Sequence, residues 1–216
     1  MRTRTDVATS GPAAAAPQNR SPWTTFSVVA VAMFLVSLDA TIVLAAFPAL
    51  RDTFPGTSTA RISWVLNAYT ITYAALLVPA GRLADTQGRR RIFLAGLAIF
   101  GLASGLAGLA PDAAWLIALR ILQAAGAALL TAASLALILA AFPPEKRAVA
   151  VSLWAAVGAL AAAFGPAVGG VLVQYSGWQS VFLVNLPIVA WAIWRGQRQL
   201  VESRGEAPGG RSPSRP

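Results

Sequence analysis

The sequence predicts an all-α membrane protein in which six helices cross the bilayer and both chain termini are cytoplasmic. The 216 residues are 56% hydrophobic and only 12% charged, whereas soluble domains carry about 25% charged residues. Six long apolar segments follow one another, and Arg and Lys are distributed unevenly among their connections. The sequence contains no Cys and no His, which excludes disulfides, thiolate or imidazole metal sites, and catalysis by either residue.

The apolar segments have the lengths of membrane-spanning helices. Most contain about 20 residues, enough to cross the hydrocarbon core at about 1.5 Å per residue. The last is shorter, but tryptophans near its ends suit the two membrane interfaces. We expect Pro48 to follow the end of the first helix and Pro143–Pro144 to follow the fourth, with consecutive helices antiparallel. The approximate limits of the segments are 24–47, 62–80, 92–110, 113–142, 148–173 and 178–194.

The two ends of the chain lack this apolar pattern. Residues 1–22 are rich in Ala, Pro, Thr, Ser and Arg without periodicity, which predicts a disordered cytoplasmic tail. Residues 196–216 are rich in Gly, Pro, Ser and Arg, which predicts a second disordered tail, basic and cytoplasmic. The transmembrane unit of six helices is therefore expected at 23–195.

The basic residues predict the orientation of the helices, because cytoplasmic loops carry an excess of Arg and Lys. The outer loops contain only Arg51 and Arg61, and Arg120 lies within a span. The net charge of +9 would suggest nucleic-acid binding in a soluble protein. Here the short basic connections are instead placed to contact anionic lipid headgroups, and no nucleic acid is expected. The inner basic residues are Arg2, Arg4, Arg20, Arg82, Arg89, Arg90, Arg91, Lys146, Arg147, Arg195, Arg198, Arg204, Arg211 and Arg215.

Two ionisable residues, Asp39 and Arg120, lie inside apolar segments. A charge there costs roughly 2.5–3.5 kcal/mol on insertion scales and is usually paired or faces a cavity. Asp39 lies roughly 12 Å and Arg120 roughly 10 Å from the outer ends of their spans, so we expect the two to approach each other inside the bundle. Three interpretations remain open: a functional pair for proton coupling or substrate contact, a purely structural pair, or an Arg120 that snorkels to the outer interface.

Arginine side chains keep their proton in proteins. A proton-coupled mechanism would therefore use Asp39 as the proton carrier, and the charge of Arg120 would adjust how readily Asp39 binds a proton. Gln123 lies one turn from Arg120 on the same helix face. It is either a polar contact in a pore or ordinary packing.

The connection between the second and third spans, residues 81–91, is highly charged. Gly81 and Gly88 permit tight turns and close backbone approach. Asp85 lies four residues before Arg89, so their side chains can neutralise each other. One interpretation is that the arginines only hold this loop on the inner side.

Several motifs together resemble the major facilitator superfamily, and more narrowly its fourteen-helix branch of drug/proton antiporters. The loop match consists of Gly81, Leu83, Asp85, Gly88, Arg89 and Arg90. The other matches, from the first span to the sixth, are Leu38–Val43 with Pro48, then Trp64–Tyr69, then Leu116, Arg120, Gln123, Gly126 and Ala128, then Gly165, Pro166, Gly169 and Gly170, and finally Trp178, Phe182, Asn185 and Pro187. The sequence departs from the usual residues at Leu44, Ala124, Ala161 and Ile188.

This resemblance implies a multi-pass transporter of a bacterial cytoplasmic membrane, and not an enzyme. It implies efflux of drugs or other small amphipathic compounds in exchange for protons, with the proton gradient as the energy source and no cofactor. In the loop, it implies a latch in which Asp85 and the arginines brace an inner gate. In the fifth span, it implies a helix bent by Pro166, with Gly165, Gly169 and Gly170 allowing another helix to approach closely.

The resemblance covers about 24–194, which corresponds to the first of the two six-helix halves of such transporters. A transport-incompetent remnant is therefore an alternative, as is a half-size subunit that pairs with itself or with a second half. The abrupt loss of the apolar pattern after Trp194 fits a central loop as well as a truncation. The substrate, the oligomeric state and a twelve- or fourteen-helix parent stay open.

Overall fold

The computed structural model describes residues 21–204, which are helical apart from short connections. The predicted tails at 1–22 and 196–216 fall mostly outside the described residues. At the C-terminal end, however, helix continues to Gln199, past the expected limit at residue 195. The helices of the described part are α1 (Pro22–Thr53), α2 (Thr59–Gln87), α3 (Arg89–Ala107), α4 (Ala113–Ala141), α5 (Pro144–Ser176), α6 (Ser180–Leu183) and α7 (Asn185–Gln199).

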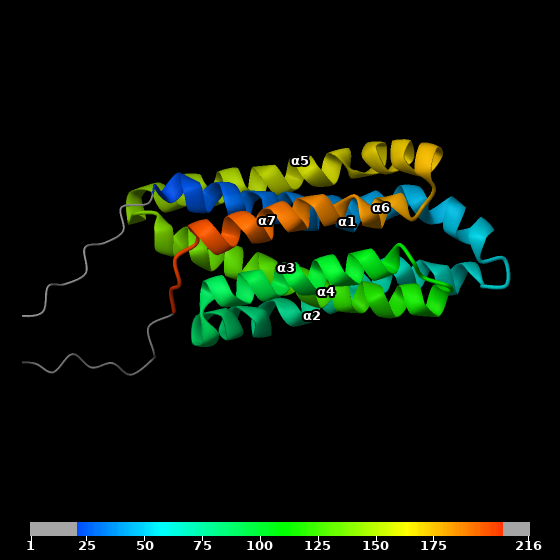
Figure 1. The fold of residues 1–216 in the computed structure, drawn as a ribbon, viewed down its shortest axis with the longest axis horizontal. Coiled ribbons are helices and arrows are strands. Elements are labelled where there is room, and N and C mark those ends of the chain that lie inside the picture. Colours follow the sequence, from blue (N-terminus) through cyan, green and yellow to red (C-terminus); the bar gives the residue numbers. More distant parts are fainter. Residues whose placement is uncertain (1–20, 205–216) are drawn as a thin grey trace, which may run out of the picture.

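The long helices lie side by side along the long axis of one bundle (Figure 1). α1 packs along α5, α4 packs against both α2 and α3, and α7 lies against α3 and α1. α1 begins and α7 ends at the same end of the bundle (Figure 1). At the opposite end, side chains cap two helices: Ser58 accepts a hydrogen bond from the amide of Arg61 at 3.3 Å, and Asp112 from that of Trp115 at 2.8 Å.

Within residues 21–204, five helices, α1 to α5, are long and apolar enough to cross a membrane. The sixth expected span is interrupted, because α6 ends at Leu183 and α7 begins at Asn185. Pro187 has no N–H to donate to the carbonyl four residues earlier, and the hydroxyl of Ser104 donates to the carbonyl of Phe182 at 2.9 Å. Val184 keeps helical backbone angles (φ −60°, ψ −23°), so hydrogen bonding is interrupted while the backbone stays helical.

Two further predicted boundaries are wrong by six or seven residues, and in both cases the helix is longer than expected. α1 passes through Pro48 and ends six residues beyond the predicted limit of residue 47, at Thr53. A proline inside a helix removes one hydrogen bond and can bend the helix without ending it. α2 likewise continues to Gln87, so Gly81 lies within a helix and not in a turn. Gly88 alone joins α2 to α3, and its φ of 114° requires glycine.

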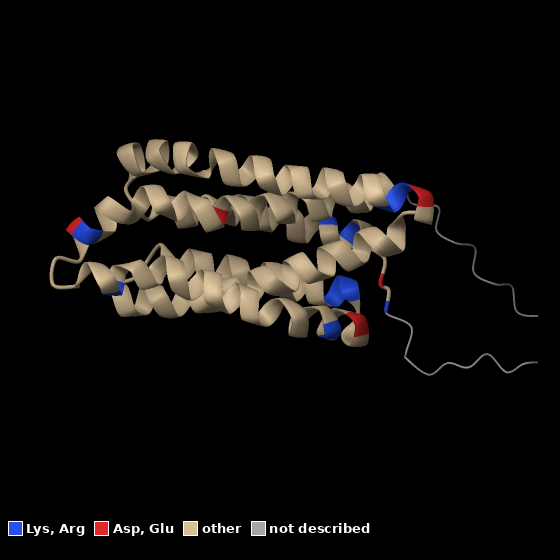
Figure 2. Cartoon of the chain, turned by 180° about the vertical axis from the view of Figure 1, so that it is seen from behind, with Lys and Arg blue, Asp and Glu red and all other residues tan. Residues whose placement is uncertain are grey.

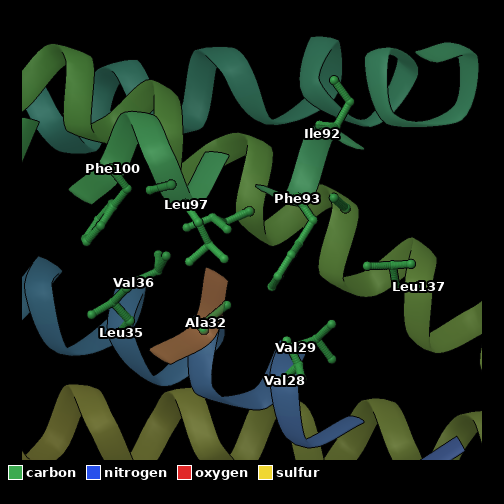
Figure 3. Packing of buried hydrophobic residues seen from close by; sticks show 14 of the residues in the cluster. Val28, Val29, Ala32, Leu35, Val36, Ile92, Phe93, Leu97, Phe100 and Leu137 are labelled. Atoms are coloured by element: carbon green, nitrogen blue, oxygen red, sulfur yellow. The ribbon is translucent and has the colours of Figure 1, made fainter. Parts of the chain in front are cut away.

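The apolar core consists of two clusters that follow each other along the bundle. In the cluster drawn in Figure 3, Val29 and Leu35 of α1 face Phe93 and Leu97 of α3. The second cluster lies toward the end with the α1–α2 connection and includes Leu50. Five polar side chains, each fully buried, lie where the two clusters meet. We call them the polar layer: Asp39, Ser104, Arg120, Gln123 and Asn185.

Basic residues concentrate at the end of the bundle where α1 begins and α7 ends (Figure 2). The opposite end carries Arg51, in the last turn of α1, and Arg61, in the first turn of α2. This asymmetry is the basis on which the cytoplasmic side was predicted from the sequence, and the cytoplasmic placement of the two ends stays a prediction.

Candidate functional site

Asp39 of α1 and Arg120 of α4 form a buried ion pair, as their depths in the spans predict. Arg120 Nη1 lies 2.6 Å from Asp39 Oδ2, and neither side chain is exposed by more than 1%. The interpretation in which Arg120 snorkels to the outer interface is therefore wrong. An ion pair without access to water depends on its neighbours for further hydrogen bonds.

Three uncharged side chains from three helices complete the surroundings of Asp39. Its second oxygen, Oδ1, accepts hydrogen bonds from Gln123 Nε2 and from Asn185 Nδ2, both at 2.8 Å. The same two amides also donate to Ser104 Oγ, at 3.1 Å and 2.9 Å respectively. Gln123 thus belongs to the buried polar layer and does not face an opening within this bundle.

Arg120 has further partners that do not depend on Asp39. Its Nη1 donates to Gln123 Oε1 at 2.9 Å, and its Nε donates to the carbonyl of Val65 at 3.1 Å. The guanidinium carbon lies 3.9 Å from the centroid of the Tyr69 ring, within the range of a cation–π contact. The ring of Tyr69 in turn stacks on Tyr73. The cation of Arg120 therefore stays partnered even when Asp39 is neutral.

This arrangement surrounds one carboxylate with groups that donate hydrogen bonds to it. A carboxyl group is able to bind a proton, whereas an arginine side chain stays charged in proteins. Within residues 21–204, no group of three His, Cys, Asp or Glu side chains is arranged to hold a metal ion. The chemistry open to the site is proton binding or contact with a cationic or hydrogen-bonding solute.

The predicted pairing in the loop motif is present. Asp85 Oδ1 accepts hydrogen bonds from Arg89 Nη2 at 2.9 Å and from Arg89 Nε at 3.1 Å. Arg89 Nη1 also donates to the carbonyl of Ala136 at 3.4 Å, which ties this corner to α4. Arg90 donates from Nη2 to the carbonyl of Gln197 at 2.8 Å and so ties the corner to α7.

Glu202, which drew no prediction, binds the start of α3. Its carboxylate accepts hydrogen bonds from the backbone amides of Arg90 and Arg91, both at 3.1 Å. These amides begin a helix and lack intrahelical acceptors, and an anion is favourable at that end. A Cβ on Gly88 would lie 2.7 Å from Glu202 Oε1, so this glycine also leaves room for the carboxylate.

The glycines of α5 do not share one role. Cβ atoms at Gly165 and Gly169 would collide with Thr41 and Ile42 of α1, as expected for a close helix contact, whereas a Cβ at Gly170 would meet nothing within 4 Å. Pro166 lies inside α5 and leaves the carbonyl of Ala162 without its helical donor. The hydroxyl of Thr41 donates to that carbonyl at 3.0 Å.

Sequence reasoning missed two parts of the polar layer. Ser104, in α3, drew no prediction, and Asn185 was noticed only as part of a family motif. Both are polar side chains inside apolar segments. The available signal was that such a side chain needs a buried partner.

A family model described as Major Facilitator Superfamily matches residues 29–213. The chain belongs to the major facilitator superfamily. Among its relatives, a tetracenomycin C resistance and export protein of Streptomyces glaucescens is 38% identical over 86% of this chain and 34% of its own length. A methylenomycin A resistance protein of Bacillus subtilis is 40% identical over 83% of this chain and 39% of its own length. The chain thus spans little more than a third of the length of these relatives.

Solved structures support the same fold for this major facilitator chain. A bacterial homolog of the human lysosomal transporter Spinster, in an inward-facing and unoccupied conformation, matches with a TM-score of 0.66 at 23% identity. The match covers 89% of this chain and 46% of that transporter. Family membership and the five long apolar helices make the protein a multi-pass membrane protein.

Proposed function

We propose that this chain is the N-terminal six-helix half of a proton-coupled transporter that exports drugs or other small amphipathic compounds from a bacterial cell. The observation that carries the proposal is the ion pair of Asp39 and Arg120. Arg120 Nη1 and Asp39 Oδ2 lie 2.6 Å apart, and both side chains are buried inside a bundle of membrane helices. Ionisable residues at such depth in transporters commonly serve proton or substrate pathways. The names of the relatives, which include a resistance and export protein, support the substrate class.

In this mechanism Asp39 is the proton carrier. Protonation removes the negative partner of Arg120, whose cation is then held by Gln123, the carbonyl of Val65 and the ring of Tyr69. A cationic substrate competes with the proton, because both neutralise the same carboxylate. Binding of one therefore favours release of the other, which is the requirement for exchange.

The exposed faces of α2 and α5 support the idea that a second half packs against this one. Only 22% of the most apolar part of α2 and 28% of that of α5 are buried within the bundle. A groove of about 490 Å³ opens between α2, α4 and α5, and its lining includes Asp85, Arg89, Thr131 and Trp154. Rocking of two halves about a central site is a common form of alternating access. The Asp85–Arg89 pair would act there as the latch of the inner gate.

The decisive experiment is transport in proteoliposomes by a complete transporter that contains this chain as its N-terminal half. We expect ethidium, an aromatic cation, to exchange against an imposed pH gradient, and Asp39→Asn to reduce uptake to the level of protein-free liposomes. Asp52→Asn, which changes an exposed carboxylate on the same helix, is the matched control. Proton-driven uptake that survives in the Asp39→Asn variant refutes the assignment of the proton carrier.

The exposed helix faces also favour a half-size subunit that needs a partner. A single cysteine at the exposed Leu160 of α5 can be cross-linked cleanly, because the chain has no cysteine of its own. Disulfide-linked pairs in membranes would support a homodimer. Uptake that appears only on co-expression with a separate second half would support a partner subunit.

We also propose that the start of α1 and the end of α7, which lie at the same end of the bundle, face the cytoplasm of a bacterial plasma membrane. An impermeant maleimide should label Gly56→Cys, in the α1–α2 connection, in intact cells. Gln87→Cys, at the end of α2, should react only after permeabilisation. The reverse pattern would contradict the orientation.

A further inference from the structure

Asn185 is the polar-layer residue that lies at the interruption between α6 and α7. It is fully buried, and it is the first residue of α7. Its Nδ2 donates to Asp39 Oδ1 at 2.8 Å and to Ser104 Oγ at 2.9 Å, while its own Oδ1 has no hydrogen-bond partner. The carboxamide thus donates both of its hydrogens to neighbouring oxygens, whereas its own carbonyl oxygen accepts no hydrogen bond.

We propose that Asn185 is a positioning residue for Asp39, holding it in the charged form through the Nδ2 hydrogen bond, and that Ser104 fixes the amide in the donating orientation. The inference rests on the proposed function in one respect, namely that Asp39 takes up the transported proton. It adds that the proton affinity of Asp39 depends on a side chain from the sixth span as well as on Arg120.

The unpaired oxygen of Asn185 is the reason to connect its orientation with the charge of Asp39. A buried amide oxygen without a partner has a cost, and the opposite orientation of the carboxamide would place that oxygen against the carboxylate. An ionised Asp39 favours the orientation in which the N–H groups of Asn185 face it, because hydrogen bonds to an ionised acceptor are roughly twice as strong as neutral ones. Protonation of Asp39 removes that preference.

Ser104 adds a second constraint from α3. Its hydroxyl oxygen accepts from both amides of the layer and donates its only hydrogen to the carbonyl of Phe182, just before the interruption. Asn185 follows the interruption and Phe182 precedes it, so Ser104 links the two sides. Asp39 is thereby connected through hydrogen bonds to the point where the sixth span is least regular.

The charged and titratable groups that face Asp39 from the helices packed around it are few. Among the described residues, α4 contributes Arg120 and α2 contributes Tyr69, whereas α3, α6 and α7 contribute only uncharged groups. α5, which packs along α1, also contributes none, because its ionisable residues lie near its two ends: Glu145, Lys146, Arg147 and Tyr175. A change of Asn185 therefore alters the donors of Asp39 without altering the charges around it.

The test is an infrared pH titration of the purified 216-residue chain in lipid nanodiscs. The carboxylic acid band of Asp39 is identified by its loss in Asp39→Asn. In Asn185→Ala we expect the midpoint of that band to move to higher pH by about 1–2 units, a ten- to hundred-fold rise in proton affinity, because the carboxylate loses a charge-assisted donor. Asn67→Ala, the same change at an exposed position of α2, is the matched control.

Three further variants distinguish a positioning role of Asn185 from a general effect on folding. Asn185→Gln keeps the amide donor and should bring the midpoint back toward the wild-type value. Ser104→Ala removes the acceptor that fixes the amide and should move the midpoint in the same direction as Asn185→Ala. Ser134→Ala, at a fully buried serine whose hydroxyl lacks a partner, should leave it unchanged.

Two results would overturn the inference. One is that the midpoint of the Asp39 band in Asn185→Ala and Ser104→Ala differs from the wild-type midpoint by no more than it does in Asn67→Ala. The other is the absence of any Asp39 band at accessible pH, which would overturn the assignment of the proton carrier as well. Proton-driven uptake that survives Asp39→Asn contradicts the proposed carrier alone, because the titration measures the effect of Asn185 without any transport.

Discussion

The neighbouring glycines Gly169 and Gly170 of α5 offer a direct test of the α1–α5 contact. In Gly169→Ala the new Cβ would lie 2.5 Å from the carbonyl oxygen of Ile42 and 3.0 Å from Ala45 Cβ. Ordinary contacts begin at 3.4 Å, so α1 and α5 must separate locally by about 0.9 Å, the difference between 3.4 and 2.5 Å. The nearest atom belongs to the backbone, which cannot move aside as a side chain can.

Overpacking of this kind costs about 1–3 kcal/mol of the free energy of unfolding. Alanine also has a higher helix propensity than glycine, by up to about 1 kcal/mol. That gain applies equally to Gly170→Ala, where nothing lies within 4 Å of the new Cβ. The difference between the two variants therefore isolates the packing cost, and Gly169→Ala should be less stable than Gly170→Ala by about 1–3 kcal/mol.

Thermal unfolding of the 216-residue chain in detergent measures this difference. For a protein of this size, each kcal/mol corresponds to about 2–4 °C in the melting temperature. We expect Gly170→Ala to melt at or slightly above the wild type and Gly169→Ala to melt below it. Equal melting temperatures for the two variants, or a lower one for Gly170→Ala, would refute the packing described for α1 and α5.

Two further predictions concern the ion pairs and the cytoplasmic corner. Arg120→Leu should destabilise the chain by about 3–5 kcal/mol, because it leaves the buried carboxylate of Asp39 unpaired, and the double variant with Asp39→Asn should recover most of that loss in detergent unfolding. A double variant no more stable than Arg120→Leu would contradict this reasoning. Glu202→Gln should weaken the binding of residues 200–204 to the start of α3 and accelerate tryptic cleavage after Arg91, whereas Glu145→Gln, at an exposed position of α5, should leave the cleavage rate unchanged.

Hydropathy and the fixed rise of a helix account for what could be predicted. Asp39 and Arg120 were expected to meet because each lies at a similar depth from the same membrane surface, and depth follows directly from residue number. The i,i+4 spacing of Asp85 and Arg89 predicted their pairing in the same way. Both inferences depend on distances along a helix axis, which vary little from one helix to another.

The wrong or missing predictions concern features that depend on which face of a helix a residue occupies, or on a partner far away in the sequence. Pro48 could not be assigned to a helix interior, because a proline is compatible with both the end and the bend of a helix. Gly169 and Gly170 look alike in sequence, yet only one faces α1. Glu202 could not be placed, because its partners on α3 lie more than a hundred residues earlier in the chain.

The hydroxyl of Thr41 has a consequence for how α1 can move. Thr41 donates to the carbonyl of Ala162, which lacks a helical donor because Pro166 has no N–H. Asp39 lies only two residues earlier than Thr41 on the same helix. At 3.6 residues per turn, these two side chains leave α1 in roughly opposite directions. A small rotation of α1 about its own axis would strain the ion pair on one side and the α5 contact on the other. A rotation of α1 caused by a charge change at Asp39 would therefore also alter the hydrogen bond from Thr41 to α5.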